Sequence, residues 1–461
     1  MLSRSLITSG RLSPRELLKT KRGNGLTTSQ MAILTLLGLI GIGTVLLSLP
    51  ISHAPSAQVT LADALFTSTS ALCVTGLTVV DTGSDFSRFG TTVILILFQI
   101  GGLGMLLWSS TMIILLGGQL GLRHRLLMKE QLPGISLAGA GRLTLNIIGF
   151  VLGVELIGAL FLWLCWYQEI PGLQGLYYAF FHSASAFCNA GFSLWSDSLA
   201  RDVGNPGVNV VVVSLIFLGS LGFAVVRDVV GSIKTRRSRL SIHSKLVLIW
   251  SAVLVLGGGL LFFLFESSHG GILQGRPFFE QVMIPIFHAT SRTAGLSTVN
   301  VGDLRPETLQ LLMGLMFIGG SPGSTAGGLK TTTFAILVLA VWSQVRGRED
   351  VEVFGRRLVP SLVFRALSMA VIAFLSLLTL AFTLNFLENI PFTEILFEAT
   401  SALAIVGLST GITPELSELS KLILCLAMLV GRVGPLTLAM SLLRPRKRNS
   451  IRYPSEDVLI G

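Results

Sequence analysis

Charged residues are scarce in this chain of 461 residues: Asp, Glu, Lys and Arg together make up 13% of it. Soluble globular domains carry about 25% charged residues, so the composition excludes an ordinary water-soluble protein. Hydrophobic residues account for 51% of the chain, and its mean hydropathy is +0.75. Because several apolar stretches approach the roughly 20 residues that cross a bilayer, the sequence predicts an integral membrane protein.

Cysteines are few and catalytic motifs are missing. The four cysteines have no CxxC spacing and lie in apolar surroundings, which predicts buried thiols rather than disulfides or a metal centre. The chain contains no Gly-x-Ser-x-Gly, no His-Glu-x-x-His and no aspartates placed to act as a pair. It also lacks Walker spacing and a Rossmann fingerprint. We therefore expect no enzyme activity and no covalently bound cofactor.

One short segment recurs four times, at residues 66–77, 181–192, 287–296 and 397–408. Each copy begins with Phe and reaches a glycine. In three copies these two residues are ten positions apart and a Ser-Ala pair occupies the same offset, whereas the third copy is two residues shorter. The glycines, which are 115, 104 and 112 residues apart, are Gly76, Gly191, Gly295 and Gly407. A period of this kind indicates an internal repeat.

Each copy is apolar but too short to cross a bilayer, and glycine should end its helix in an extended segment. Non-helical backbone at membrane depth is tolerated only where protein buries it or where it lines water. A half-crossing helix whose last carbonyls face a cation is one way to build an ion filter. We expect the filter to be made by backbone carbonyls of Val74, Thr75, Gly76, Asn189, Ala190, Gly191, Thr293, Ala294, Gly295, Ile405, Val406 and Gly407.

The predicted fold is an all-α membrane protein of four span–pore-helix–span repeats, in a pseudo-fourfold arrangement around a central cation pore. A polar segment, 1–30, precedes repeats at 31–122, 123–233, 234–344 and 345–443, and a tail follows at 444–461. The predicted spans are 31–51, 92–116, 143–166, 208–230, 245–265, 309–342, 360–387 and 422–443. The predicted half-crossing helices are 61–73, 177–191, 278–295 and 393–407.

The net charge of +10 is concentrated at the two ends of the chain and in the loops between repeats. The other loops carry acidic residues such as Asp81, Asp85, Asp197 and Asp202. By the positive-inside rule, both termini are then cytoplasmic and the filter opens outward from a plasma membrane. This orientation accounts for the basic charge, so we expect no nucleic-acid partner.

Only the second span of repeat three is interrupted, by residues 319–330. Five glycines and a proline in this stretch cannot form a regular helix. The break is either a kink that permits packing or a flexible barrier below the filter, and its glycine hinges favour a gate. We assign the gate to Gly319, Gly320, Ser321, Gly323, Ser324, Thr325, Gly327, Gly328, Lys330 and Arg432.

Two arginines lie within apolar segments, where a charge is costly and needs a partner. Arg432 is in the middle of the last span, and we expect it to bind the carbonyls that the break exposes. Lys330 would add a second positive charge below the filter. Arg292 precedes the third filter segment, and a pairing with Glu394 or Glu398 of the neighbouring pore helix is one candidate for it.

These features together resemble the Trk/Ktr/HKT superfamily of potassium transporters. The runs 99–104 (QIGGLG) and 452–461 (RYPSEDVLIG) are most similar to its bacterial KtrB subunits. The resemblance implies potassium as the substrate at the filter carbonyls and an intramembrane gate that the last-span arginine helps to hold. It also implies a bacterial inner-membrane location.

The partners are implied by the resemblance alone. They are a second copy of the chain in a homodimer, a KtrA-like ring of cytosolic nucleotide-binding subunits, and membrane lipid, with sodium as a coupling or activating ion in symport. Sodium-selective relatives replace the first filter glycine by serine, so Gly76 favours potassium. A sodium-selective or non-selective cation transporter of the same fold is the alternative.

Overall fold

The computed structural model describes residues 28–55, 57–104, 140–235, 240–434 and 456. These residues are almost entirely helical, which confirms the predicted class. One order of elements, a long helix, a short helix and a second helix, occurs four times along the described chain. The groups are α2 (Thr28–Ser48), α3 (Leu61–Cys73), α4 (Arg88–Leu103); α7 (Ala140–Trp166), α8 (Gly172–Cys188), α9 (Pro206–Leu221); α11 (Ile242–Glu266), α12 (Phe278–Ser291), α13 (Pro306–Phe317); and α15 (Pro360–Leu387), α16 (Phe392–Ala404), α17 (Glu418–Val433).

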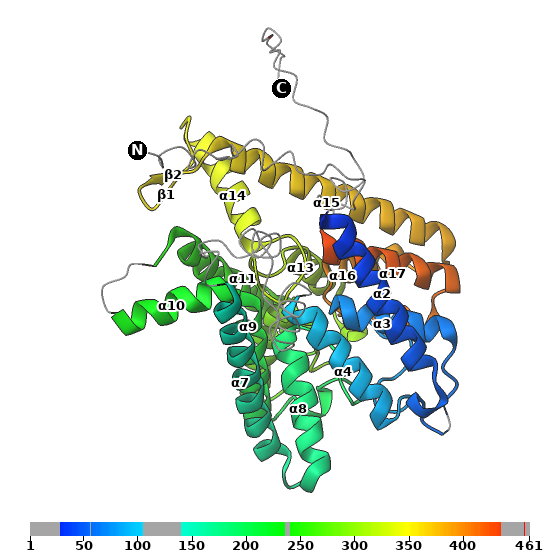
Figure 1. Ribbon diagram of the computed structural model, residues 1–461. Helices are drawn as coiled ribbons and strands as arrows, with labels where there is room; N and C mark the ends of the chain where they lie inside the picture. The colour runs from blue at the N-terminus through cyan, green and yellow to red at the C-terminus, as the bar shows by residue number, and fades with distance from the viewer. Residues whose placement is uncertain (1–27, 56, 105–139, 236–239, 435–455, 457–461) are drawn as a thin grey trace, which may run out of the picture.

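Two further helices follow second helices: α10 (Phe223–Thr235) after α9, and α14 (Thr331–Val345) after α13. A hairpin between α14 and α15 pairs β1 (Glu352–Val353) with β2 (Arg356–Arg357). Short 3-10 turns lie in the loops at η1 (Pro50–Ser52), η2 (Ala200–Asp202), η3 (Val301–Asp303) and η4 (Thr413–Glu415). In Figure 1, α2, α3 and α4 form one packed group, α7, α8 and α9 another, and α16 and α17 lie along α15.

The short helices lie where the sequence predicts them. α3 has the predicted bounds, and α8, α12 and α16 overlap the segments predicted at 177–191, 278–295 and 393–407. A capping box fixes the start of α3: the Thr60 hydroxyl accepts from the Asp63 amide at 3.2 Å, and the Asp63 carboxylate accepts from the Thr60 amide at 3.1 Å. Each short helix leads directly into the glycine segment that follows it.

The phenylalanine that opens each recurring segment packs into the core of the preceding group of helices. Phe181 lies in the core around α2 and α4, Phe287 in that of α7 and α9, and Phe397 in that of α11 and α13. Phe66 completes the circle, because it lies in the core of α15 and α17. All four rings are fully buried. The four groups therefore interlock in a closed order, each through one aromatic side chain.

The prediction of eight continuous spans is only partly met. Among the described residues, three helices are long and apolar enough to cross a membrane: Thr144–Trp166, Ile242–Glu266 and Pro360–Leu387. Apolar side chains on these helices face outward, including Leu156, Leu256 and Phe364. The predicted spans 92–116 and 422–443 lie partly outside the described residues.

The span predicted at 208–230 is wrong as a single helix. α9 ends at Leu221, and α10 leaves it at an angle of 100°. The residue between them, Gly222, has φ 87°, a backbone conformation that breaks a helix and that glycine adopts without strain. The turn leaves the amide of Phe223 free of the α9 ladder, and it donates to the carbonyl of Gly323 at 3.1 Å.

A break at this level is not peculiar to repeat three, contrary to the sequence analysis. α4 and α17 are each followed by a glycine with positive φ, Gly104 at 83° and Gly434 at 87°, as α9 is by Gly222. In repeat three α13 ends at Phe317, which confirms the interruption predicted there, and the helical chain resumes as α14. Repeat three thus differs from repeat two in having a longer segment between the two helices, from Phe317 to Thr331 rather than from Leu221 to Phe223.

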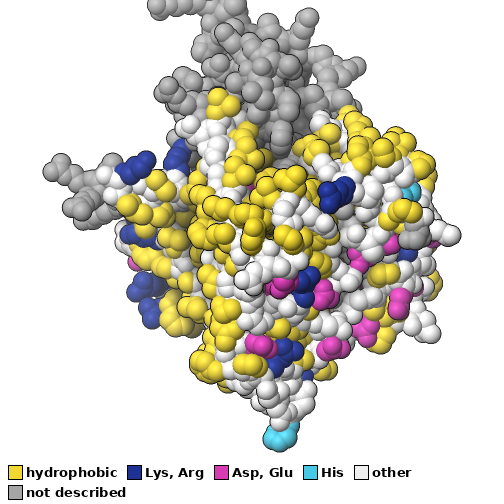
Figure 2. Space-filling model, turned by 90° about the horizontal axis from the view of Figure 1, so that it is seen from below, with side chains coloured by type: hydrophobic (Ala, Val, Ile, Leu, Met, Phe, Trp, Pro, Cys, Tyr) yellow, Lys and Arg dark blue, Asp and Glu magenta, His cyan; other side chains and the backbone are white. Residues whose placement is uncertain are grey.

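The surface separates polar from apolar regions. Figure 2 shows one face of the molecule, on which Asp and Glu side chains gather among polar surface and hydrophobic side chains border them. Acidic residues of the loops that follow the recurring segments include Asp81 and Asp197, which line one surface pocket together with Glu169 and Arg201.

Candidate functional site

The four glycines of the recurring segments meet at one place. All have positive φ angles, 90° at Gly76, 74° at Gly191, 73° at Gly295 and 100° at Gly407. A methyl group at Gly76 would lie 2.5 Å from the carbonyl oxygen of Ala190, and one at Gly191 would lie 2.7 Å from that of Ala294. Glycine is therefore required at these positions for two reasons: the positive φ angle strains other residues, and there is no room for a side chain.

The contacts of the four glycines close a ring. Gly76 faces the second segment and Gly191 faces the third, while Gly295 approaches Val406 and Gly407 of the fourth. Gly407 in turn approaches the carbonyl of Thr75 in the first. The structure thus brings together segments that are more than 100 residues apart, in the same cyclic order as the phenylalanine contacts.

Three of the short helices end in the same way. The residue after each helix, Val74, Asn189 or Ile405, adopts the left-handed conformation, with φ 63°, 57° and 57°. The next amide then bonds back to a carbonyl inside the helix: Thr75 to Ser70 at 2.8 Å, Ala190 to Ser185 at 2.8 Å, and Val406 to Ser401 at 2.9 Å. This C-terminal cap turns the chain out of the helix and into the glycine segment.

The third copy reaches the ring differently because it is two residues shorter. Arg292, after α12, keeps a right-handed conformation, and the amides of Ala294 and Gly295 both donate to the Ser291 carbonyl, at 2.8 and 3.0 Å. The shorter segment still presents Gly295 to Gly407. The length difference seen in the sequence is therefore absorbed at the helix end.

A buried serine braces each segment, a role that the sequence analysis did not assign. Ser70 and Ser401 accept from the amides of Gly76 and Gly407, at 3.1 and 3.0 Å. Ser185 donates to the carbonyl of Phe192 at 2.7 Å, and Ser291 donates to that of Leu296. The signal was present in the sequence, because this serine is four residues after the phenylalanine in all four copies, including the shortened one.

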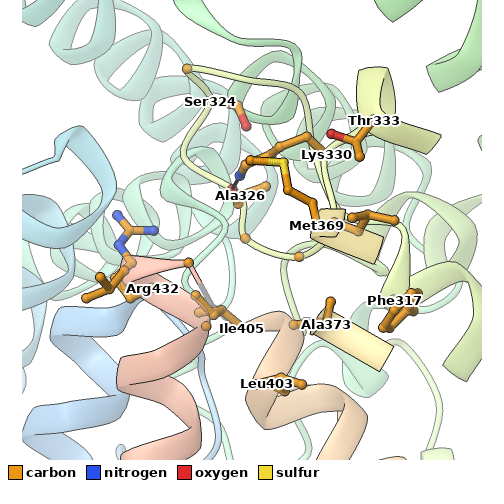
Figure 3. A pocket seen from close by; sticks show the side chains of 18 of the residues that line it. Phe317, Ser324, Ala326, Lys330, Thr333, Met369, Ala373, Leu403, Ile405 and Arg432 are labelled. Atoms are coloured by element: carbon orange, nitrogen blue, oxygen red, sulfur yellow. Dashed lines mark hydrogen bonds between the residues drawn. The ribbon is translucent and has the colours of Figure 1, made fainter. Parts of the chain in front are cut away.

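Two cavities lie on either side of the glycines. One, of about 580 Å³, is lined by the four glycines and by residues that follow them, such as Thr78, Ser193 and Asp197. The other, of about 380 Å³, is lined by residues that precede the fourth glycine and by most of the glycine-rich loop 319–330. Figure 3 shows this second cavity, with Arg432 and Lys330 among its lining side chains.

The glycine-rich loop folds back on itself. The amide of Gly319 donates to Leu329 at 2.9 Å, and that of Gly320 donates to Gly327 at 3.2 Å. The ammonium of Lys330 donates to the carbonyl of Ala326 at 2.8 Å. Backbone groups released from the helix are thereby partly satisfied within the loop, as the burial of polar backbone requires.

The loop is also attached to its neighbours. On one side it bonds to the end of α9, through Ser321 to Ser220 at 3.0 Å and Thr325 to Gly219 at 3.2 Å. On the other, Gly327 lies so close to the carbonyl of Ala404, at the end of α16, that a methyl group there would be 2.6 Å from it. Through the Thr325 hydroxyl, which lies 3.2 Å from the carbonyl of Phe187, the loop also contacts the second recurring segment. The loop therefore lies against the second and fourth segments.

Arg432 has the kind of partner that the sequence predicts. Its guanidinium donates to the carbonyl of Thr325 in the loop at 3.1 Å, and also to the carbonyl of Gly101 near the end of α4. The contact with the loop is thus confirmed, and the contact with Gly101 is new. Arg432 joins three separate parts of the chain: α17, α4 and the loop.

The predicted pairing of Arg292 with Glu398 is wrong, and none of the ion pairs among the described residues joins Arg292 to Glu394. Arg292 donates to carbonyls at the end of α13 and the start of the loop, those of Leu315, Ile318 and Gly319. The end of a helix leaves such carbonyls without partners, so it competes well for a guanidinium.

Glu398 lies on the other side of the ring and accepts from the loop after the fourth segment. Its partners are the Ser409 hydroxyl, the Thr410 amide at 3.2 Å and the Thr413 hydroxyl at 3.0 Å. Arg292 therefore binds the start of the glycine-rich loop, whereas the sequence analysis paired it with a glutamate of α16.

Other expectations can be checked briefly. All four cysteines are free, and three are buried while Cys165 is half-buried. The described residues contain no cluster of three His, Cys, Asp or Glu side chains that could hold a metal ion.

Comparison with known proteins identifies the family. The TrkH family model, described as "Cation transport protein", matches residues 26–450. Ktr system potassium uptake protein B of Bacillus subtilis (strain 168) is 39% identical over 422 residues, 91% of this chain and 94% of the relative. The protein of the same name from Vibrio alginolyticus is 39% identical over 433 residues, covering 94% of each chain.

Two further similarities extend this result. Potassium/sodium uptake protein NtpJ of Enterococcus hirae is 36% identical over 430 residues, 92% of this chain and 95% of the relative. The crystal structure of the potassium transporter TrkH from Vibrio parahaemolyticus matches the fold with a TM-score of 0.71, covering 93% of this chain and 88% of that one at 20% identity. The chain belongs to the TrkH family of cation transport proteins.

Proposed function

We propose that this protein is the ion-translocating subunit of a Ktr-type potassium-uptake system, and that potassium passes through the glycine ring. The single observation that carries the proposal is the closed set of contacts among Gly76, Gly191, Gly295 and Gly407, which four distant segments form with positive φ angles. The relatives named for potassium uptake support the choice of ion.

In this proposal the four repeats surround a central pore in a pseudo-fourfold arrangement. A potassium ion exchanges its water for the backbone carbonyls of the filter residues, Val74 to Gly76, Asn189 to Gly191, Thr293 to Gly295 and Ile405 to Gly407. The C-terminal ends of α3, α8 and α16 point their negative dipole ends at the start of these segments. The serine braces hold the carbonyls in place, so the ion need not organise them.

The wider cavity beyond the glycines is the outer mouth of the proposed pore. Asp81 and Asp197 line it, and acidic side chains at a mouth raise the local cation concentration. This assignment agrees with the orientation that the basic loops predict, with both termini in the cytoplasm of a bacterial cell. The proposed repeat boundaries are those of the sequence analysis: 31–122, 123–233, 234–344 and 345–443.

The loop 319–330 is the proposed gate. It lies between the ring and the cavity that contains Arg432 and Lys330, and a cation leaving the filter would meet both positive charges there. Arg432 and Arg292 tie the loop to α4 and to the filter of repeat three. Opening requires the loop to move away from the path, which breaks at least the contact between Arg432 and Thr325.

Sodium, the partners and the assembly rest on the relatives rather than on the contacts in this chain. The relative named for potassium and sodium uptake supports sodium as a coupling or activating ion, and keeps a sodium-selective or non-selective transporter as the alternative. The relatives named as parts of a Ktr system support a partnership with other components of such a system. The assembly that we propose, a homodimer seated on a cytosolic ring of nucleotide-binding, KtrA-like subunits, comes from the family resemblance.

The test is cation-dependent growth of a host that lacks its own potassium uptake. Expression of this protein with a Ktr-type cytosolic subunit should restore growth at low potassium, and ⁸⁶Rb⁺ uptake should be competed by potassium more strongly than by sodium. Measuring ⁸⁶Rb⁺ uptake with and without added sodium shows whether sodium activates rubidium uptake or competes with it. Membrane-inserted protein that restores no growth and takes up sodium in preference to rubidium would favour the alternative.

A further inference from the structure

Thr325, in the middle of the glycine-rich loop, is held through every polar group that it has. Its amide donates to Gly219 at 3.2 Å, and its carbonyl accepts from Arg432 at 3.1 Å. Its hydroxyl lies 3.2 Å from the carbonyl of Phe187 and 3.1 Å from that of Gly219. The residue is 1% exposed. No other part of the loop is joined in this way to the end of the second pore helix.

The fourth partner of Thr325 is a filter side chain. Asn189 caps α8, and its side-chain nitrogen donates to the Thr325 hydroxyl at 2.7 Å. The side-chain oxygen of Asn189 accepts from the hydroxyl of Thr293, in the third filter segment, at 2.9 Å. Asn189 and Thr293 are both buried. One amide side chain therefore joins the loop to two of the four filter segments.

The amide is a feature of repeat two alone. The equivalent left-handed caps of repeats one and four are Val74 and Ile405, whose side chains cannot form hydrogen bonds. An asparagine is thus not needed to end the pore helix. α9 also accommodates the network, because a methyl group at Gly219 would lie 2.7 Å from the side-chain nitrogen of Asn189.

We propose that Asn189 and Thr325 are positioning residues that couple the loop to ion selectivity. While the loop is in place, the chain of bonds from Thr325 through Asn189 to Thr293 fixes the second and third filter segments relative to each other. When the loop withdraws, Asn189 loses one buried partner, and these segments gain freedom. This inference rests on the proposed function, and it adds that the loop controls the fit of the filter as well as access to it.

The physical reason is the burial of the network. A buried N–H or hydroxyl without a partner is disfavoured. The side-chain nitrogen of Asn189 donates to the Thr325 hydroxyl and also to the carbonyl of Phe187 at 3.2 Å, so withdrawal of the loop removes one of its two bonds. Movement of the loop away from Asn189 therefore costs free energy unless another acceptor replaces Thr325. Filter selectivity depends on where the carbonyls can move, so a change in the constraint on two of the four segments changes the discrimination between cations of different size.

The experiment compares matched loop variants reconstituted in liposomes with the cytosolic subunit. Thr325→Val removes the hydroxyl and keeps the shape, Thr325→Ser keeps the hydroxyl, and Asn189→Gly removes the amide while still allowing the left-handed cap. Thr331→Val is the control, because Thr331 is equally buried near the loop but its hydroxyl contacts Ser321 instead of the filter. The readout is the ratio of ⁸⁶Rb⁺ to ²²Na⁺ flux, together with the total flux.

Thr325→Val and Asn189→Gly should each lower the rubidium-to-sodium ratio by about fivefold, the value for one net hydrogen bond. Thr325→Ser and Thr331→Val should leave it near the wild-type value, and the double variant should be no worse than either single one. Additive losses, or an equal loss in Thr331→Val, would overturn the coupling and leave a structural role. A wild-type protein without preference for rubidium would instead contradict the proposed function.

Discussion

Replacing Arg432 by alanine removes the two hydrogen bonds that join α17 to the glycine-rich loop and to the end of α4. The carbonyl of Thr325 accepts a hydrogen bond from Arg432, and no other donor among the described residues bonds to this carbonyl. The substitution also removes a positive charge from the cavity of about 380 Å³ below the filter. Both effects should favour a loop that leaves the ion path.

The size of the effect follows from the bonds. Only the bond to Thr325 holds the loop, because the other bond joins Arg432 to Gly101 of α4. A hydrogen bond to a charged group contributes about 1.5–3 kcal/mol, so at the lower value this bond holds the loop by about 1.5 kcal/mol. Since 1.4 kcal/mol is a factor of ten, loss of this bond shifts the loop equilibrium about tenfold. Uptake should rise by no more than this factor, because the filter limits flux once the loop is open.

Two further variants separate anchoring from repulsion. Arg432→Lys keeps the charge, but its single ammonium cannot bridge the two carbonyls as the planar guanidinium does. Arg432→Gln removes the charge and can still reach one carbonyl. If anchoring dominates, lysine should give an intermediate increase in uptake; if repulsion dominates, lysine should behave as the wild type and glutamine as alanine.

The assay is the initial rate of ⁸⁶Rb⁺ uptake into liposomes, normalised to protein inserted in the membrane. Each variant is also measured in a chain that lacks residues 323–326, because that deletion removes Thr325. Uptake that stays the same or falls in Arg432→Ala, with normal insertion, would refute the reasoning. So would an increase of the same size in the deleted chain, since Arg432 would then act independently of the loop.

Three other predictions follow from the same contacts. Deleting residues 323–326 alone should raise cation flux without changing membrane insertion, and lower flux would mean that the loop supports permeation. Phe287→Ala should destabilise the protein by about 3–5 kcal/mol, measured as a lower Tm in detergent, because it empties a fully buried site between two groups of helices; the half-exposed Phe374→Ala on α15 is the control and should change Tm little. In a cysteine-free chain, an impermeant thiol reagent outside the cell should label a cysteine at Asp85 and spare one at Arg237, and the reverse result would invert the orientation.

The elements nearest the glycine ring could be predicted because local chemistry determines them. α3 begins at a Thr–Asp capping box, and Gly76 follows three residues after its end at Cys73; both residue patterns are readable in the sequence. The left-handed cap at Val74 is not, because valine seldom adopts that conformation. The recurrence of the segment predicted its copies with similar accuracy. The sequence predicted that the four segments surround one centre. It did not predict which segment contacts which, because no local sequence signal determines contacts between distant segments.

The break after α9 could not be read from the sequence because it lies in an apolar run. Residues 215–226 are hydrophobic apart from one serine and two glycines, so composition alone favours a continuous span. The turn at Gly222 is stabilised instead by a distant partner, the carbonyl of Gly323. Arg292 illustrates the same limit: a carboxylate is the obvious partner for a guanidinium, and the carbonyls at the end of α13 become alternatives only once the helix is seen to stop.

The central claim, that potassium passes through the glycine ring, is tested most directly by Gly76→Ser. The added side chain would lie 2.5 Å from the Ala190 carbonyl, and serine is strained at the φ of 90° found there. Gly38→Ser is the matched control, because a side chain on this α2 glycine meets no atom within 4 Å. The ratio of ⁸⁶Rb⁺ to ²²Na⁺ uptake should fall in Gly76→Ser and stay unchanged in Gly38→Ser at equal membrane content. An unchanged ratio in Gly76→Ser would place the ion path elsewhere.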